Sequence, residues 1–522
     1  MPVRRFTLHI RRAGSIALLG LALNARLAPA IEAPKPPTGQ SPAPGSAPAP
    51  RAPDPGNAPA APTAPPADVP AAHAPTAPAN TAATPGAAPA GTGPPPTRED
   101  QKAVYREFRS AFDAKRYDQA RPLAERAVQI TEQVNGRDVM ELVTPLNNLA
   151  QTLYALKDYA AAEEQYLRSI KIIETRAGNN PRLSHTLFGL GRVYVAAGQD
   201  EFAIAVFKRA VEITRKSDGL FSITQLPYLY PLIDVYERAD HGADADREEQ
   251  YLLSIAERNY AQSSPQFIAA VERQARWQEQ QYKFTAARRF WAQAIELTRR
   301  AGDVRDIRQV NQLRGLARCY RNEYLFGSND PEANTTTTDP FQLGGPSLAQ
   351  TPINRLDPEG QHMLENALSL LQNANGPLGT RLKRDTTIDL GDWYWVAGDY
   401  KTAAVKYATA WDLLSGEERA STGPDNPLAQ PALLYYSEPR VATKNPKAKP
   451  EDIDQKFVEM QFAVNDRGRV GDIKVLNSDA SESQQKSVMA AMHRALYRPR
   501  LVERKLAATD GVKFREIVYS KR

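Results

Sequence analysis

The sequence is 522 residues long and has room for more than one domain with a buried core. Its formal net charge of +6 is small for this length, and no dense basic stripe or recognisable reading module accompanies it, which argues against nucleic acid as the partner. The one cysteine, Cys319, excludes an intramolecular disulfide and any metal site built from several cysteines.

Residues 1–30 have the pattern of a secretory signal peptide. Arginines between residues 4 and 12 precede a short apolar run at residues 13–25, and Ala28-Pro29-Ala30 offers a cleavage site with small residues. The run is shorter than the roughly 20 apolar residues that cross a membrane as a helix. We therefore expect export to the periplasm. An uncleaved N-terminus that anchors the chain in the inner membrane is the alternative, and would be its only membrane association.

Residues 31–98 form a segment rich in proline and alanine, without any aromatic residue. Such a composition cannot bury enough apolar surface to fold, so we expect a disordered linker that is partly polyproline II. The segment is either a passive connection or a spacer that lets the folded part search across a compartment.

From about residue 99 apolar residues recur at helical spacing, and the pattern itself repeats. The clearest copy predicts a hairpin of two helices, with characteristic residues at Leu187, Leu190, Gly191, Tyr194, Ala203, Phe207 and Ala210. The alanine of the second helix recurs at Ala120, Ala162, Ala203 and Ala287. The steps are 42, 41 and 84 residues, and the last is twice 42. This period predicts seven hairpins over residues 99–416, two of them degenerate.

The motif resembles the tetratricopeptide repeat, and its long period is similar to that of kinesin light chains, as is the phrase "LNNLA" at residues 146–150. The resemblance implies a mainly α-helical solenoid. It also implies a scaffold that binds a protein or peptide partner on the concave face formed by the first helices of the hairpins.

Arginine is frequent at the positions that face this predicted groove. The predicted groove residues are Arg109, Asn148, Arg192, Arg276, Arg314, Arg318, Arg321 and Trp395. A guanidinium group can pair with a carboxylate through two hydrogen bonds, so an acidic peptide or a C-terminal carboxylate would fit. The arginines could equally form a solvated helix face. Trp395 could equally pack against the domain that follows.

Residues 326–358 interrupt the sixth hairpin with a long polar insertion. Long loops are either functional or disordered, and we expect disorder here.

Past residue 416 the helical pattern gives way to strands, in a module expected at residues 431–522. Apolar residues alternate at Val458, Met460, Phe462 and Val464, so they predict a strand with one buried face. A second strand is expected at residues 470–476, a helix after it with Val488, Met492 and Leu496 on one side, and strands at residues 497–503 and 512–519. Asp510-Gly511 is expected to turn the chain between the last two.

This order resembles the C-terminal domain of the energy transducer TonB. The resemblance rests on "VEMQFAVNDRGRVGDIKVLNSD", "ALYRPRLV" and "DGVKFREIV", and covers residues 456–521. The "YP" pair that usually precedes the first strand in that family is absent, and so is its long N-terminal membrane helix. The resemblance therefore implies an α+β fold and a link to envelope or outer-membrane transport, with energy transduction from the inner membrane as the alternative function.

A small sheet with an open edge can accept an extended peptide as an added strand. The candidate edge is the last strand, with Val512, Phe514 and Val518. Alternatively the chain's own residues 431–442 cover that edge.

The sequence contains no H-E-x-x-H, G-x-x-x-x-G-K or G-x-S-x-G motif, and its six histidines form no ligand pair. Cys319 lies within a predicted first helix and is expected to be packed and inert. We therefore expect no enzymatic activity, no cofactor and no metal.

Overall fold

The computed structural model describes residues 95–178, 180–239, 241–302, 307–328, 356–437 and 453–521. The expected signal peptide, the linker up to residue 94 and the insertion between residues 329 and 355 lie outside the described residues. Helices dominate up to residue 420, and strands dominate after it. Within the described residues no helix is long and apolar enough to cross a membrane.

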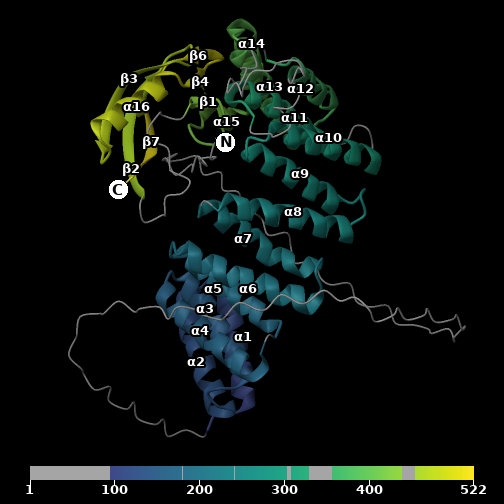
Figure 1. The fold of residues 1–522 in the computed structure, drawn as a ribbon, viewed down its shortest axis with the longest axis vertical. Helices are drawn as coiled ribbons and strands as arrows, with labels where there is room; N and C mark the ends of the chain where they lie inside the picture. The colour runs from purple at the N-terminus through teal and green to yellow at the C-terminus, as the bar shows by residue number, and fades with distance from the viewer. Residues whose placement is uncertain are drawn as a thin grey trace, which may run out of the picture. The chain divides into compact units, whose positions relative to one another are not determined.

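Fourteen described helices form seven hairpins in which α1 pairs with α2, α3 with α4, and so on to α13 with α14 (Figure 1). The helices are α1 (Arg98–Asp113), α2 (Tyr117–Asn135), α3 (Val143–Ala155), α4 (Tyr159–Ala177), α5 (Arg182–Ala196), α6 (Asp200–Asp218), α7 (Leu226–Arg238), α8 (Gly242–Asn259), α9 (Pro265–Gln280), α10 (Phe284–Ala301), α11 (Arg308–Phe326), α12 (Glu359–Leu370), α13 (Pro377–Val396) and α14 (Tyr400–Asp412). Two short 3-10 turns, η1 (Met140–Leu142) and η2 (Ile223–Gln225), precede α3 and α7. Each hairpin packs on the next, so the predicted repeat of helical hairpins is confirmed.

In five of the seven hairpins the described turn places one residue in the left-handed backbone region. This residue is Lys115, Lys157, Gly198, Tyr282 or Gly398 in the hairpins where the positive φ is seen. The left-handed residue ends the first helix with a backbone hydrogen bond to the preceding turn, and the second helix can then fold back against the first.

Glycine in the first helix allows the two helices of a hairpin to approach closely. A Cβ atom added at Gly191 would lie 2.4 Å from Cε1 of Phe207, and one added at Gly391 would lie 2.5 Å from Cε1 of Tyr407. Both aromatic side chains are fully buried. The aromatic residue of the second helix therefore fills the space that the glycine leaves.

The C-terminal module is built of short helices and strands. Its elements are α15 (Gly416–Ala420), β1 (Ala432–Tyr435), β2 (Ile453–Val464), β3 (Val470–Ser478), α16 (Glu482–His493), β4 (Leu496–Arg498), β5 (Arg500–Val502), β6 (Lys505–Ala507) and β7 (Thr509–Lys521). β2 lies between β3 and β7 in an antiparallel sheet. β1 pairs with β4, and β5 pairs with β6. The alternating residues of β2 and the apolar side of α16 form the module's core.

The expected turn at Asp510-Gly511 is wrong, because both residues lie inside β7. Gly511 has a φ of +73° at an irregularity in the pairing of β7 with β2, so it is part of a bulge. The chain reverses earlier, at Glu503 and Arg504, which both have positive φ between β5 and β6. Leu496, expected in the helix, begins β4.

An apolar cluster joins the last hairpin to the C-terminal module. Trp395 and Tyr407 of the hairpin pack in one buried cluster with Leu428 and Leu501, and the backbone N–H of Leu501 donates to the carbonyl of Leu428 over 2.8 Å. The module is therefore attached to the hairpins by packing as well as by the chain.

Candidate functional site: the face formed by the first helices

The predicted groove positions lie on the first helices α1, α3, α5, α7, α9, α11 and α13, and the side of the hairpins that they form is called the first-helix face below. On its last three helices the arginines are paired with acidic residues. Arg318 on α11 donates through Nη2 to the Glu279 carboxylate on α9 over 2.9 Å. Although burial opposes the charged form, the Glu279 carboxylate raises the pKa of Arg318. Arg276 lies 3.5 Å from Glu272 on its own helix.

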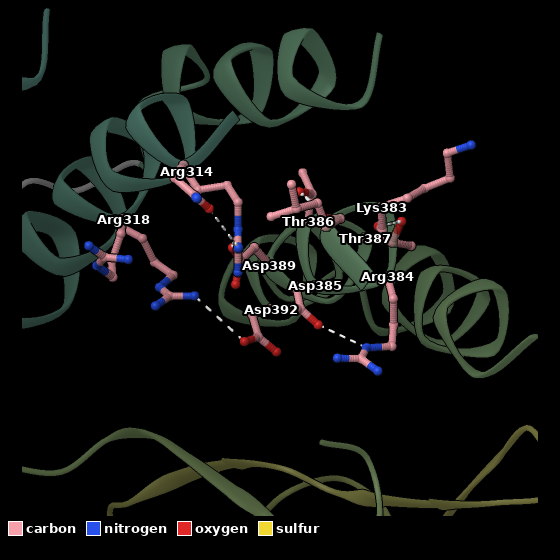
Figure 2. A network of polar contacts seen from close by, with 12 residues as sticks. Arg314, Arg318, Lys383, Arg384, Asp385, Thr386, Thr387, Asp389 and Asp392 are labelled. Atoms are coloured by element: carbon pink, nitrogen blue, oxygen red, sulfur yellow. Dashed lines mark hydrogen bonds and ion pairs between the residues drawn. The ribbon is translucent and has the colours of Figure 1, made fainter. Parts of the chain in front are cut away.

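The same arrangement continues from α11 to α13. Arg314 donates through Nε to Oδ2 of Asp389 over 2.6 Å, and Nη1 of Arg321 lies 3.7 Å from Oδ2 of Asp392. Figure 2 shows Asp389 and Asp392 on the side of α13 that faces α11. Arg314 and Arg321 are mostly shielded from solvent, at 20% and 15% side-chain exposure.

These pairs correct part of the sequence prediction. Arg314, Arg318 and Arg321 do face their neighbouring first helices, but their guanidinium groups are already held by carboxylates of the same chain. These three guanidinium groups are therefore not free to bind an acidic ligand. The partner carboxylates lie 39 residues or more away in the chain, so helical spacing alone does not reveal them.

Two other predicted arginines behave differently. Arg109 lies 3.4 Å from Asp113, and both side chains are more than half exposed, so this pair is weak. Arg192 stacks on Tyr154, with its guanidinium carbon 4.7 Å from the ring centroid. Within the described part of the chain Arg192 contacts aromatic rings and has no acidic partner, so it is a cation still available to a ligand.

α7 carries two carboxylates that sequence reasoning missed. Asp234 and Glu237 make no ion pair or hydrogen bond through their carboxylates among the described residues, although Arg273 is close enough to act on both charges. The exposed ring of Tyr230 lies one turn before them on the same side of the helix. Partial burial, together with Asp234 and Glu249, raises the pKa of Glu237 to about 7. The repeat period could have identified Asp234 as a groove position, because it follows Arg192 by 42 residues, although its copy of the motif is degenerate.

A hollow opens where the first two hairpins meet. Its volume is about 470 Å³, and it lies between α1, α2, η1 and α3. Tyr105, Phe108 and Pro145 provide apolar walls, while Arg98 and Asn148 provide polar groups. The Asn148 side-chain amide makes no hydrogen bond within the described residues. Of the predicted groove residues, Asn148 is therefore the one that lines this hollow.

The prediction that Trp395 faces the groove is wrong. Its side chain is 1% exposed, and its ring packs against the rings of Tyr400 and Tyr407 at centroid distances of 4.7 and 6.1 Å. It belongs to the cluster shared with the C-terminal module, so the alternative interpretation of this residue is the one that the structure supports.

β7 is an edge strand in the described sheet, where it pairs only with β2. Val518 is buried, and Val512 and Phe514 pack partly against the module's core, so it is the backbone of β7 that borders the open side. β1 does not cover that side, because it pairs with β4. The Tyr436 ring does contact the Phe514 ring at 5.3 Å. Residues 438–442 lie outside the described part.

Cys319 is fully buried in α11, as expected. Burial raises the pKa of its thiol well above the usual value, so the reactive thiolate is disfavoured. In the ranges that the structure describes, no group of three or more histidine, cysteine or acidic residues could hold a metal ion.

Comparison with known proteins identifies the repeat type of the first hairpins. The family model "Tetratricopeptide repeat" matches residues 109–175 and 144–216, so this part of the chain consists of tetratricopeptide repeats. Repeats of this kind are in general scaffolds for protein interaction. None of the curated proteins matches the chain.

Several solved structures are similar in fold. Tetratricopeptide-like repeats of a kinesin light chain from Podosopora anserina are 17% identical, cover 39% of this chain and 96% of their own, and have a TM-score of 0.35. A repeat protein from Cytophaga hutchinsonii is 13% identical, with 59% and 93% covered and a TM-score of 0.37. One from Parabacteroides merdae is 11% identical, with 61% and 95% covered and a TM-score of 0.32.

Proposed function

We propose that this tetratricopeptide-repeat chain is an exported scaffold that binds a peptide segment of a protein partner along the first-helix face of its first four hairpins. The observation that carries the proposal is the hollow of about 470 Å³ between α1, α2, η1 and α3. This volume lies in the range of ordinary ligand pockets, and the unpartnered amide of Asn148 can donate to and accept from a peptide backbone.

The unpaired charges of this face define the chemistry of the peptide. Arg98 at the hollow and Arg192 on α5 are cations without an acidic partner in the described residues. On α7 the carboxyl groups of Asp234 and Glu237 lie close to Glu249, and Arg273 is the basic residue that acts on both. The peptide would therefore carry an acidic group near α1 to α5 and a basic group near α7. This proposal keeps the acidic partner that the sequence predicts and adds a basic residue to it.

Selection from a phage-displayed library of random dodecapeptides tests this proposal. Peptides that bind the wild-type chain should lose about tenfold in affinity with Asn148→Ala or Tyr105→Ala, because the hollow loses a hydrogen-bonding amide or an apolar wall. Asn366→Ala, an exposed asparagine on the second helix α12, is the matched control and should leave binding unchanged. Equal affinity for all variants would place the site elsewhere.

The location is a second part of the proposal and rests on the sequence pattern of residues 1–30. Intact mass measurement of the chain from its native host should give a product that begins near Ile31. A full-length mass would instead favour the membrane-anchored energy transducer.

The C-terminal module is proposed to dock on an outer-membrane transport protein or another envelope protein by strand addition to β7. The TonB-like sequence order and the unpaired side of β7 in the described sheet support this proposal. A photo-crosslinking amino acid at the exposed Lys513 on β7 should capture an envelope protein. The same group at Lys474 on β3, the opposite edge of the sheet, should not. Equal capture at both edges would contradict strand addition at β7.

A further inference from the structure

Asp392 on α13 is a buried carboxylate on the first-helix face of the last hairpin, with 5% exposure. The Tyr407 hydroxyl donates to its Oδ1 over 2.9 Å. Nη1 of Arg498 lies 3.1 Å from both of its oxygens, and Nη1 of Arg321 lies 3.7 Å from Oδ2. Two guanidinium groups and a phenol therefore surround one carboxylate.

The Arg498 guanidinium comes from β4 in the C-terminal module, 106 residues further along the chain. It is 7% exposed, and its Nη2 donates to the carbonyl of Pro427 over 3.1 Å. Its central carbon lies 5.9 Å from the centroid of the Tyr407 ring. A carboxylate, a carbonyl and an aromatic face thus enclose the guanidinium on three sides.

This site occupies the position that would face a ligand in the other hairpins. Asp392 is the counterpart of Arg192, Arg276 and Arg318 in the repeat register. On α9 and α11 the corresponding arginines pair with carboxylates of the hairpins themselves. At Asp392 the closer of the two pairing guanidinium groups comes from outside the hairpins, as the side chain of a bound peptide would.

We propose that Asp392, Tyr407 and the Pro427 carbonyl form a guanidinium-binding site that the chain fills with its own Arg498. The C-terminal module is then an intramolecular occupant that closes the first-helix face at its sixth and seventh hairpins. When Arg498 is displaced while the apolar cluster of Trp395, Tyr407 and Leu501 stays packed, the site accepts an arginine side chain of a partner protein.

The energetics allow such an exchange. Burying an ion pair costs desolvation of both charges, which the attraction between them roughly offsets, so a paired Arg498 contributes little net stability. A vacant site is different, because the buried Asp392 then keeps the Tyr407 hydroxyl but has only the more distant Arg321 as a countercharge. The filled site is therefore more stable than the vacant one, and one guanidinium group can replace another at little cost in free energy.

The first test removes the occupant from the full chain. Arg498→Ala should raise amide exchange in α13 and β4 at least tenfold, while β2 and β3 keep their protection because the module has its own core. Arg500→Ala is the control: this arginine lies two residues further along and donates to the Ala508 carbonyl instead, so exchange should not change. Unchanged exchange in Arg498→Ala would overturn the proposal, because Arg498 would then not hold the module against α13. An equal rise in β2 and β3 would also overturn it, because the substitution would then destabilise the whole module and not a separable contact.

The second test asks whether the vacated site recognises a guanidinium. Millimolar ethylguanidinium should restore the protection of α13 in Arg498→Ala, and ethylammonium, which cannot contact both carboxylate oxygens and the Pro427 carbonyl in a planar arrangement, should not. Asp392→Asn in addition should abolish the rescue. Equal rescue by both cations, or none, would show that the site is not specific for guanidinium. Binding of dodecapeptides at the first hairpins should be unaffected, so this test is independent of the proposed function.

Discussion

Gly191 illustrates how a single position sets the distance between two helices. A Cβ atom there would lie 2.4 Å from Phe207, whose ring is fully buried and cannot move aside without disturbing the core. We expect Gly191→Ala to lower the free energy of unfolding by about 1–3 kcal/mol, measured by urea denaturation. Gly416→Ala is the control, because a Cβ there meets no atom within 4 Å. Equal stability of the two variants would contradict this account.

Glu237 makes stability depend on pH. Its pKa is about 7 in the folded chain and 4.5 as a free side chain, so between these values the folded state binds more protons and stability falls as pH rises. Glu237→Gln removes this effect. At pH 8 the variant should be more stable than the wild type by about 1–2 kcal/mol, after allowance for solvent screening, and at pH 4 the two should be alike. Thermal denaturation at both pH values measures this, and a difference independent of pH would contradict it.

At the scale of the element, the hairpin turn depends on a left-handed residue that is not always glycine. Lys157 has a φ of +64°, where a side chain is strained. We expect Lys157→Gly to stabilise the chain by about 0.5–1 kcal/mol, since the relief of strain exceeds the greater flexibility of glycine in the unfolded chain.

Lys171→Gly, in the exposed interior of α4, is the control for this turn and should destabilise by about 1 kcal/mol. Thermal denaturation of both variants gives the comparison. A loss of stability in Lys157→Gly would mean that its side chain makes a favourable contact larger than the strain.

The helices could be predicted because each copy of the motif reports on the same local geometry. Strands over residues 497–503 and 512–519 could be predicted as well, but the position of the turn between them could not, because Asp510-Gly511 has the composition of a turn while the chain reverses at Glu503-Arg504, which carries no turn signal. Of the residues that line the hollow between the first two hairpins, only Asn148 was among the predicted groove residues. The pairing of Arg314 and Arg318 depends on which first helices are neighbours, and a motif read one copy at a time does not contain that information.

At the scale of the molecule, the last hairpin depends on the module that follows it. Trp395 and Leu414 are covered by a cluster that includes Leu501 and Leu506 of the module. A chain that ends at Gln430 should therefore lose amide protection in α13 and α14. The hairpins α1–α6 should keep theirs, because repeats are stabilised mainly by their nearest neighbours. Hydrogen exchange measures both, and full protection of α13 in the shortened chain would contradict this dependence.

The buried thiol of Cys319 can report on local opening of the sixth hairpin, because it reacts only when it becomes exposed. There is one cysteine per chain, it lies in α11 beside Arg318, and its burial suppresses reaction with thiol reagents in the closed state. At reagent concentrations where an aromatic disulfide reacts faster than the sixth hairpin recloses, the labelling rate of the unmodified chain equals the rate at which that hairpin opens, without any engineered probe.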